Sequence, residues 1–263
     1  MTVDGKKIAQ EIVAQLLHMR PSLLSSVKLG VVLAEGDAAS ASFVRIKERV
    51  AEKLGVELVR EFLTKEMGTK DALAAIDRLA KMTQGIIVQL PLPKQFDSEE
   101  ILAAVPTTYD ADALNPAQTV VRAPVAEAVS EILVRHNISA QNKKAVVVGA
   151  GRLVGTPVIE LLKNLGAHVS VVTLDEGSLS DLHDADIVIS GAGSPGMILP
   201  QMLKEGVVLI DAGTSESGGK VVGDADPSCA EVASVFTPVP GGVGPIAVAM
   251  LFRNLFELVK TQK

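Results

Sequence analysis

A glycine-rich turn is the first group of residues whose types and spacing indicate chemistry. Gly149, Gly151 and Gly155 follow an apolar run, residues 144–148, in the pattern GxGxxxG. Glycines between a strand and a helix let backbone N–H groups approach a pyrophosphate at the positive end of the helix dipole. The segment therefore predicts a dinucleotide-binding turn; the alternative is a tight turn without a ligand.

An acidic residue after the next apolar run bears on the choice of dinucleotide. Asp175 lies 20 residues after Gly155. A carboxylate at this point accepts hydrogen bonds from both hydroxyls of an adenosine ribose and repels a 2′-phosphate. It therefore favours NAD over NADP, unless Asp175 is only a turn residue.

A lysine within an apolar helix face is a second candidate. Phe43 and Lys47 are four residues apart, and Val50 and Leu54 continue the same face. Such a lysine either extends its apolar stem toward water or exchanges protons in a site.

Three further segments combine polar and rigid residues. Gln89 stands at the carboxyl end of an apolar run, where open α/β sheets bind ligands; it either faces a ligand or caps a loop. Asp110 and Asp112 lie in a proline-rich segment, where they either recognise a polar heterocycle or form a solvated turn. Residues 237–245 form a rigid proline- and glycine-rich segment, suited to close approach of a ligand or to an unusual domain connection.

The elements that must position these residues alternate along the chain. Apolar runs predict strands, and longer patterns predict helices, so we expect an α/β protein of two α/β domains, the second a Rossmann-like parallel sheet. The expected domains are residues 1–120, with a C-terminal helix at 245–263 packing back on them, and residues 121–244. The predicted strands are 28–33, 56–62, 85–90, 144–148, 168–173, 185–190 and 207–211, and the predicted helices are 40–54, 71–82, 125–134, 153–165 and 244–259.

Composition excludes several classes of protein. A net charge of −6, no Trp and 3% aromatic residues argue against a nucleic-acid partner. The single cysteine, Cys229, and four scattered histidines provide neither an internal disulfide nor a metal site. Prolines and glycines interrupt the uncharged residues 232–252, so we expect no membrane span. The start of the chain lacks the apolar stretch of a signal peptide, and a cytoplasmic protein is expected.

Taken together, these segments resemble the bifunctional methylenetetrahydrofolate dehydrogenase/cyclohydrolase (FolD) family over nearly the whole chain. Long proline and glycine strings matched in order make the resemblance specific. It is carried by Asp4-Gly5-Lys6, Val88-Gln89-Leu90-Pro91-Leu92-Pro93, Asp110-Ala111-Asp112, Val154-Gly155-Thr156-Pro157, Ile210-Asp211-Ala212-Gly213, Gly219-Lys220-Val221-Val222-Gly223-Asp224 and Thr237-Pro238-Val239-Pro240-Gly241-Gly242-Val243-Gly244-Pro245.

The resemblance implies a cleft between two domains, tetrahydrofolate derivatives as substrates, NAD or NADP as cofactor and a homodimer formed through the second domain. It implies oxidation of 5,10-methylenetetrahydrofolate to the methenyl form and hydrolysis of that form to 10-formyltetrahydrofolate. It assigns catalysis to Lys47, its partner Gln89 and the pterin-binding Asp112. It assigns folate binding to Phe43, Pro240, Gly241, Gly242 and Val243. It assigns cofactor binding to Gly149, Gly151, Arg152, Leu153, Val154, Gly155, Asp175, Ala192 and Gly213.

Five departures from the family pattern keep alternatives open. Phe43 stands where the family usually has Tyr, Ala113 where it has Gly, and Ala150 where it often has Arg. The threonine of the usual Pro-x-Thr-Pro segment is absent from Val121-Arg122-Ala123-Pro124, and Ala247 stands where the family usually has Thr. Because a tyrosine hydroxyl is missing, a dehydrogenase without hydrolase activity and a non-catalytic binding relative are alternatives. A two-domain dehydrogenase of the shikimate type is a further one, although no matching substrate motif supports it.

Overall fold

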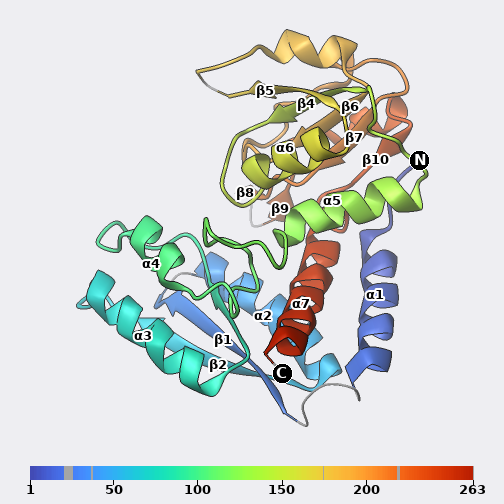
Figure 1. Cartoon of the computed structure of the whole chain (residues 1–263). Helices are drawn as coiled ribbons and strands as arrows, with labels where there is room; N and C mark the ends of the chain where they lie inside the picture. The colour runs from blue at the N-terminus through green and yellow to red at the C-terminus, as the bar shows by residue number, and fades with distance from the viewer. Residues whose placement is uncertain (21–25, 37, 174, 218–219, 263) are drawn as a thin grey trace. The chain divides into compact units, whose positions relative to one another are not determined.

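The computed structural model describes all residues except 21–25, 37, 174, 218–219 and 263 (Figure 1). The protein is α/β, as predicted, with strands and helices that alternate along the chain. It forms two compact units: unit 1 comprises Met1–Ala9 and Val125–Ala247, and unit 2 comprises Gln10–Pro124 and Val248–Lys263.

Unit 2 is built on a parallel sheet with the strand order β2-β1-β3. The segment after α4 extends this sheet, because Asp110 forms a parallel bridge with Ile86 at the free edge of β3. The elements are the larger part of α1 (Gly5–Met19), β1 (Val27–Ala34), α2 (Ala38–Leu54), β2 (Val56–Leu63), α3 (Thr69–Met82), β3 (Gly85–Val88), α4 (Ser98–Ala104) and the larger part of α7 (Val243–Thr261).

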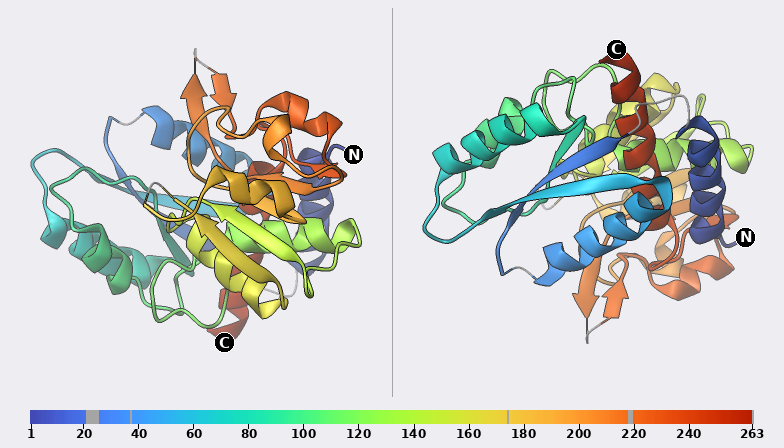
Figure 2. Two further views of the ribbon diagram at one scale, coloured as in Figure 1. Left: turned by 90° about the horizontal axis from the view of Figure 1, so that it is seen from above. Right: turned by 90° about the horizontal axis from the view of Figure 1, so that it is seen from below.

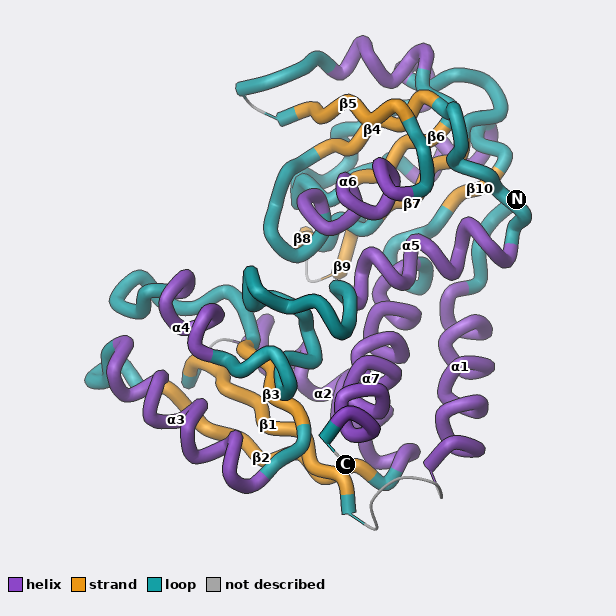
Figure 3. The backbone as a smooth tube through the Cα atoms, viewed as in Figure 1, coloured by secondary structure: helices purple, strands orange, loops and turns teal. Residues whose placement is uncertain are grey.

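Helix α3 shows how the sequence builds the core of unit 2. Asp71 accepts a hydrogen bond from the backbone N–H of Gly68 and so closes the first turn. Ala72, Ala75, Ile76 and Leu79 share one helix face and are buried. Burial of each large aliphatic side chain is worth about 1.5–3 kcal/mol. Helices α3 and α4 lie side by side, as Figure 3 shows.

Unit 1 contains a five-stranded parallel sheet with the strand order β10-β7-β6-β4-β5, which confirms the predicted Rossmann-like sheet. The order reverses direction at β4 and β6, and ligands of open α/β sheets bind at such a switch point. The elements are α5 (Pro124–Arg135), β4 (Lys144–Val148), α6 (Gly155–Asn164), β5 (His168–Val172), the 3₁₀ helix η2 (Leu179–Asp184), β6 (Ile187–Ser190), η3 (Pro200–Met202), β7 (Val208–Asp211), β8 (Ser215–Ser217), β9 (Lys220–Val222), η4 (Pro227–Glu231) and β10 (Val235–Phe236).

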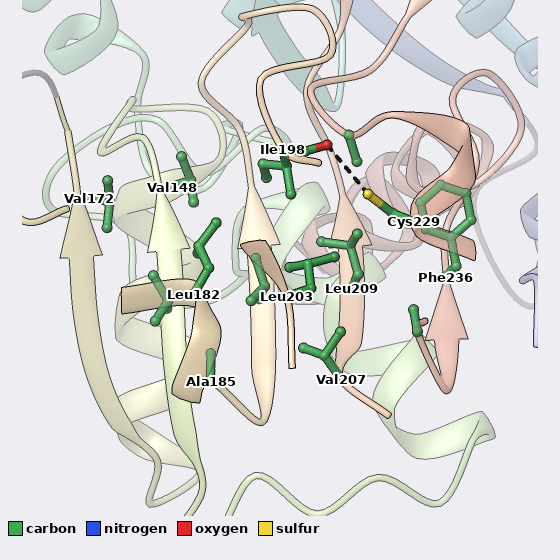
Figure 4. Packing of buried hydrophobic residues seen from close by; sticks show 14 residues of the cluster. Val148, Val172, Leu182, Ala185, Ile198, Leu203, Val207, Leu209, Cys229 and Phe236 are labelled. Carbon is green, nitrogen blue, oxygen red and sulfur yellow. Dashed lines mark hydrogen bonds between the residues drawn. The ribbon is translucent and has the colours of Figure 1, made fainter. Parts of the chain in front are cut away.

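The register aligns the carboxyl ends of four strands of this sheet. Val148 pairs with Val172 on one side and with Ser190 on the other, and Ser190 pairs with Asp211. The loops that follow these strands therefore begin in one row at the same edge. The core beneath them contains Cys229, whose buried thiol lies 3.4 Å from the Ile198 carbonyl oxygen (Figure 4).

The first residues of the chain, Met1–Ala9, belong to unit 1. Thr2 forms a parallel bridge with Phe236, and the Val3 N–H donates to the Phe236 carbonyl at 2.8 Å. The Phe236 N–H in turn donates to the Met1 carbonyl at 2.9 Å. These hydrogen bonds pair the start of the chain with the outer edge of β10.

Several elements were not predicted from the sequence. They include α1, α4, the short strand β10 and the antiparallel hairpin of β8 and β9, which extends away from the rest of unit 1 in Figure 2. Gly219, part of one family motif, lies outside the described residues. Among the helices that the structure describes, none has both the length and the apolar character needed to cross a bilayer.

Candidate active site

Lys47 and Gln89 form the centre of the candidate site in unit 2. Val44, Ala51 and Leu54 are buried and anchor α2, which leaves Lys47 partly buried. The Lys47 Nζ donates to the Gln89 Oε1 at 2.9 Å. The Gln89 Nε2 donates to the Leu90 carbonyl at 2.8 Å, so the amide oxygen is turned toward the lysine. A protein amide thus holds the ammonium at the carboxyl end of β3.

Asp112 joins these two groups because its segment is paired with β3. The Ile86 N–H donates to the Tyr109 carbonyl at 2.6 Å, and the Ala111 N–H donates to the Ile86 carbonyl at 3.2 Å. Continuing this parallel register brings Asp112 level with the end of β3. Burial raises the pKa of Asp112 above its ordinary value, and the nearby Lys47 ammonium opposes that rise.

Asp110 has a different environment from Asp112, although the two acids are only two residues apart. Its Oδ2 accepts a hydrogen bond from the Asn115 N–H at 2.8 Å, and the side chain is buried. Burial raises its pKa to about 6, and the charge of Asp112 adds to the effect. Asp110 therefore organises the local turn, whereas Asp112 interacts with Lys47.

Asn254 on α7, which belongs to none of the sequence motifs, supports this segment. Its buried Nδ2 donates to the Ala111 carbonyl at 3.0 Å and to the Arg122 carbonyl at 2.8 Å. The Ala111 peptide is thereby held by β3 through its N–H and by α7 through its carbonyl. The available signal was a polar residue on the same helix face as the buried Leu251, Leu255 and Leu258.

Phe43 lies one turn before Lys47 on α2, and 42% of its surface is exposed. The residues of the predicted apolar face of α2 therefore have two different roles. Leu54 belongs to the core, whereas the Phe43 ring remains accessible to a ligand. An exposed aromatic face next to a polar cluster is suited to stacking on a flat heterocycle.

The glycine turn of unit 1 meets the geometric requirements of a dinucleotide site. Gly149 has φ of 91° and forms the tight turn after β4. A Cβ atom at Gly151 would meet no described atom within 4 Å, so the backbone there can be approached closely. A Cβ atom at Gly155 would overlap the Gly149 carbonyl, so this glycine allows α6 to begin directly against the strand. These are the three uses of glycine in dinucleotide-binding turns, and the residues present fit such a cofactor.

The remaining predicted cofactor residues lie in loops of unit 1. Val154 packs against Gly191, just before Ala192. Asp175 is exposed in the turn after β5, where its N–H donates to the Thr173 Oγ1 at 3.3 Å. Gly213 lies against the carboxylate of Asp224, so a packing role accounts for this glycine. Arg152 and Leu153 lie in the glycine turn before α6, and 44% of Leu153 is exposed.

The proline- and glycine-rich loop also belongs to unit 1. Gly241 has φ of 110°, which favours glycine, and a Cβ atom there would lie 3.6 Å from the Lys6 side chain. A Cβ atom at Gly5 would overlap the Gly242 carbonyl. The Asp4-Gly5-Lys6 motif therefore packs against the loop that contains Pro240, Gly241, Gly242 and Val243. No group of three potential metal-binding side chains occurs among the described residues.

Comparisons with known proteins agree with this geometry. Residues 3–112 match the catalytic domain of tetrahydrofolate dehydrogenase/cyclohydrolase, and residues 123–263 match its NAD(P)-binding domain. The bifunctional protein FolD of Halothermothrix orenii is 36% identical over 98% of this chain and 97% of its own.

Solved structures extend the comparison. The bifunctional FolD enzyme of Campylobacter jejuni has a TM-score of 0.95 at 31% identity, covering 100% of this chain and 99% of its own. The FolD of Trypanosoma brucei, complexed with NADP and an inhibitor, has a TM-score of 0.93 at 29% identity, covering 100% and 98%.

Proposed function

The chain belongs to the tetrahydrofolate dehydrogenase/cyclohydrolase family, and we propose that it catalyses both reactions of that name. It oxidises 5,10-methylenetetrahydrofolate to the methenyl form with a nicotinamide cofactor and hydrolyses the methenyl form to 10-formyltetrahydrofolate. Unit 2 is the folate-binding catalytic unit, and unit 1 binds the cofactor. The observation that carries the proposal is the Lys47–Gln89 hydrogen bond, with Asp112 close to the same ammonium.

Lys47 handles the proton in the hydrolysis. Water adds to the methenyl carbon, and one of its protons passes to the Lys47 amine, which leaves a hydroxyl on that carbon. The bond from the carbon to N5 then breaks: N5 takes the proton from Lys47, and the hydroxyl proton leaves to solvent as the formyl C=O forms. Gln89 holds the Nζ in place through its Oε1, which restricts the lysine to one position. Positioned proton transfer of this kind contributes about 10²–10⁴-fold to a rate.

Asp112 and Phe43 are suited to hold the pterin. Asp112 offers carboxylate oxygens that accept hydrogen bonds from ring N–H groups. Phe43 offers an exposed ring face one helical turn from Lys47. Stacking and directed hydrogen bonds together fix the orientation of the reacting carbon, and orientation is a large part of catalysis.

The turn Gly149–Gly155 of unit 1 would hold the pyrophosphate of the cofactor at the start of α6. When bound, the nicotinamide ring accepts the hydride that the methylene carbon loses. The chain's own contribution to this step is alignment: the glycine turn, Ala192 and the loops along the carboxyl edge of the sheet supply a preformed surface.

We further propose that NAD is preferred over NADP. Ala150 provides no cation in the glycine turn, and Asp175 adds an exposed carboxylate after β5. A 2′-phosphate about 4 Å from that carboxylate would be repelled by about 1–4 kcal/mol. About 1.4 kcal/mol corresponds to a tenfold difference in affinity, so calorimetry should give a clearly lower Kd for NAD.

A spectroscopic assay tests both proposals. Methylenetetrahydrofolate oxidation should be faster with NAD than with NADP, and the methenyl absorbance should then decay faster than it does without enzyme. Oxidation without enzyme-dependent decay would indicate a dehydrogenase alone. Absence of both reactions would contradict the proposed function, and equal or tighter binding of NADP would contradict the cofactor preference.

A further inference from the structure

A buried carboxylate holds the loop that follows β6 in unit 1. Asp224 is fully buried, two residues after the end of β9. Its Oδ2 accepts hydrogen bonds from the Ser190 hydroxyl at 2.6 Å, the Ala192 N–H at 2.7 Å and the Gly193 N–H at 3.3 Å. Its Oδ1 accepts the Ser194 N–H at 2.6 Å. Four donors from five consecutive residues thus converge on one side chain.

Three of these donors form a concave anion-binding arrangement. Successive backbone N–H groups with one residue in the left-handed conformation make a nest, which often binds phosphate. Gly193, with φ of 68°, supplies the left-handed residue. Here the chain's own carboxylate fills the nest. Hydrogen bonds to a charged acceptor are about twice as strong as neutral ones, so the loop is fixed firmly.

The loop held in this way lies directly against the dinucleotide-binding turn. A Cβ atom at Gly149 would lie 2.9 Å from the Gly191 carbonyl oxygen and 3.0 Å from the Ala192 nitrogen. Val154, which precedes α6, packs on Gly191 from the other end of the turn. Because the backbone of Gly149 is in close contact with Gly191 and Ala192, a shift of residues 190–194 would change the conformation of the glycine turn. Both segments follow the strands at the switch point of the sheet.

A fifth hydrogen bond holds the loop through a backbone carbonyl. The Ser215 hydroxyl donates to the Gly193 carbonyl at 2.9 Å. The Ser215 hydrogen bond does not involve the N–H groups of Ala192, Gly193 and Ser194, which all donate to Asp224. Replacing the Asp224 carboxylate removes the charged acceptor that these three groups share, and a buried donor without a partner destabilises the loop.

We propose that Asp224 is a positioning residue for the nicotinamide cofactor: it holds residues 190–194 in the conformation against which the glycine turn binds the dinucleotide. The inference rests on the proposed function, because it assigns this residue to the cofactor side of that reaction. Asp224 acts through the loop and is not itself a catalytic residue.

Calorimetric titration of NAD into the full chain tests the role of Asp224. Asp224→Asn should raise the Kd by about tenfold or more, since at least one charge-assisted hydrogen bond is lost. Ser190→Ala, which removes one hydroxyl and leaves the N–H groups bonded, should raise it by about threefold. Asp226→Asn is the matched control, because this acid caps η4 through the Ser228 N–H and an asparagine can also cap a helix. Its Kd should equal that of the parent.

A cofactor-free measurement separates positioning from loss of folding. Hydrolysis of methenyltetrahydrofolate requires no nicotinamide, so Asp224→Asn should oxidise more slowly than the parent at subsaturating NAD but hydrolyse at the parent rate. Parent-like NAD affinity in both Asp224→Asn and Ser190→Ala would overturn the inference. A weakened affinity accompanied by an equal loss of hydrolysis in both variants would also overturn it, because the role would then be general stability. If the parent itself binds no nicotinamide cofactor, the proposed function fails instead.

Discussion

Lys47 and Gln89 are 42 residues apart in the sequence, and the ammonium of the first donates directly to the amide oxygen of the second. Helix α2 supplies one group and the carboxyl end of β3 the other. Neither side chain reaches the other by local structure, so the parallel sheet creates the pair. Proton transfer by Lys47 therefore depends on how α2 packs against the sheet of unit 2.

Replacing Lys47 with Met should abolish hydrolysis without unfolding the protein. Methionine keeps an unbranched apolar stem and removes the proton-carrying group, so the rate of methenyl decay should fall by about 10²–10⁴-fold. Lys53→Met, at an exposed position of the same helix, is the control and should behave as the parent. Parent-like hydrolysis by Lys47→Met would mean that Lys47 is only an amphipathic surface residue.

Replacing Phe43 with Tyr should accelerate hydrolysis. The new hydroxyl would extend from a ring that already lies one turn from Lys47, and a hydrogen bond to a charged group is worth about 1.5–3 kcal/mol. We expect a gain of about tenfold to a hundredfold in the rate of methenyl decay. Phe62→Tyr, also at an exposed position, should give no gain. An unchanged or slower Phe43→Tyr variant would show that the site is built around phenylalanine.

Replacing Ala113 with Gly should stabilise the protein. Ala113 has φ of 54°, and this left-handed conformation costs an L-residue about 1–2 kcal/mol. Glycine removes that strain and loses about 0.5–1 kcal/mol through greater backbone freedom in the unfolded chain. The free energy of unfolding in urea should therefore rise by about 0.5–1 kcal/mol.

A second glycine substitution provides the control for Ala113. Ala117 belongs to the same segment, but its backbone is not left-handed. Ala117→Gly should therefore lower the free energy of unfolding, because only the entropic cost remains. Equal destabilisation by both substitutions would contradict the assignment of strain to Ala113.

Asp110 should make the protein less stable as the pH rises from about 4 to about 7. Its pKa is about 6 in the folded protein, against an ordinary value of 3.8, because burial disfavours the charged carboxylate. The folded state therefore binds more protons than the unfolded state between these values. The contribution is present in full below pH 3.8, and about 3 kcal/mol is lost as the pH rises through 6.

Two measurements test this pH dependence. Burial also raises the pKa of Asp211 to about 6, so a ¹³C NMR titration should give two aspartate carboxyl signals near pH 6, of which one disappears in Asp110→Asn. Urea titrations of the parent and Asp110→Asn should show that the stability of the parent, relative to the variant, decreases with pH. A constant difference between the two proteins across this range would contradict the prediction.

Local sequence patterns predicted most strands of both sheets. The apolar runs of β1, β4 and β7 end at turn residues, and buried parallel strands have this pattern. The expected strand 85–90 ends at Val88, because Gln89 turns its side chain to Lys47 ahead of Pro91. Helix α1 was missed, although Asp4 caps it and Ile8, Ile12 and Leu16 recur on one buried face.

The roles of several polar residues could not be predicted from local pattern. The sequence presents Asp110 and Asp112 as an equivalent pair, and only the pairing with β3 shows that Asp112 interacts with Lys47 while Asp110 is structural. Asp224 and Asn254 act on backbone groups at least 30 and more than 130 residues away, respectively. Such contacts depend on the complete fold.

The pairing of Met1 and Val3 with Phe236 has a consequence for how the protein can be divided. A fragment made only of residues 125–247 would lack the backbone groups that cover the outer edge of β10. An uncovered strand edge is a template for pairing with another chain. We expect such a fragment to self-associate through Phe236, and a short peptide of the first nine residues, added in trans, to suppress that association.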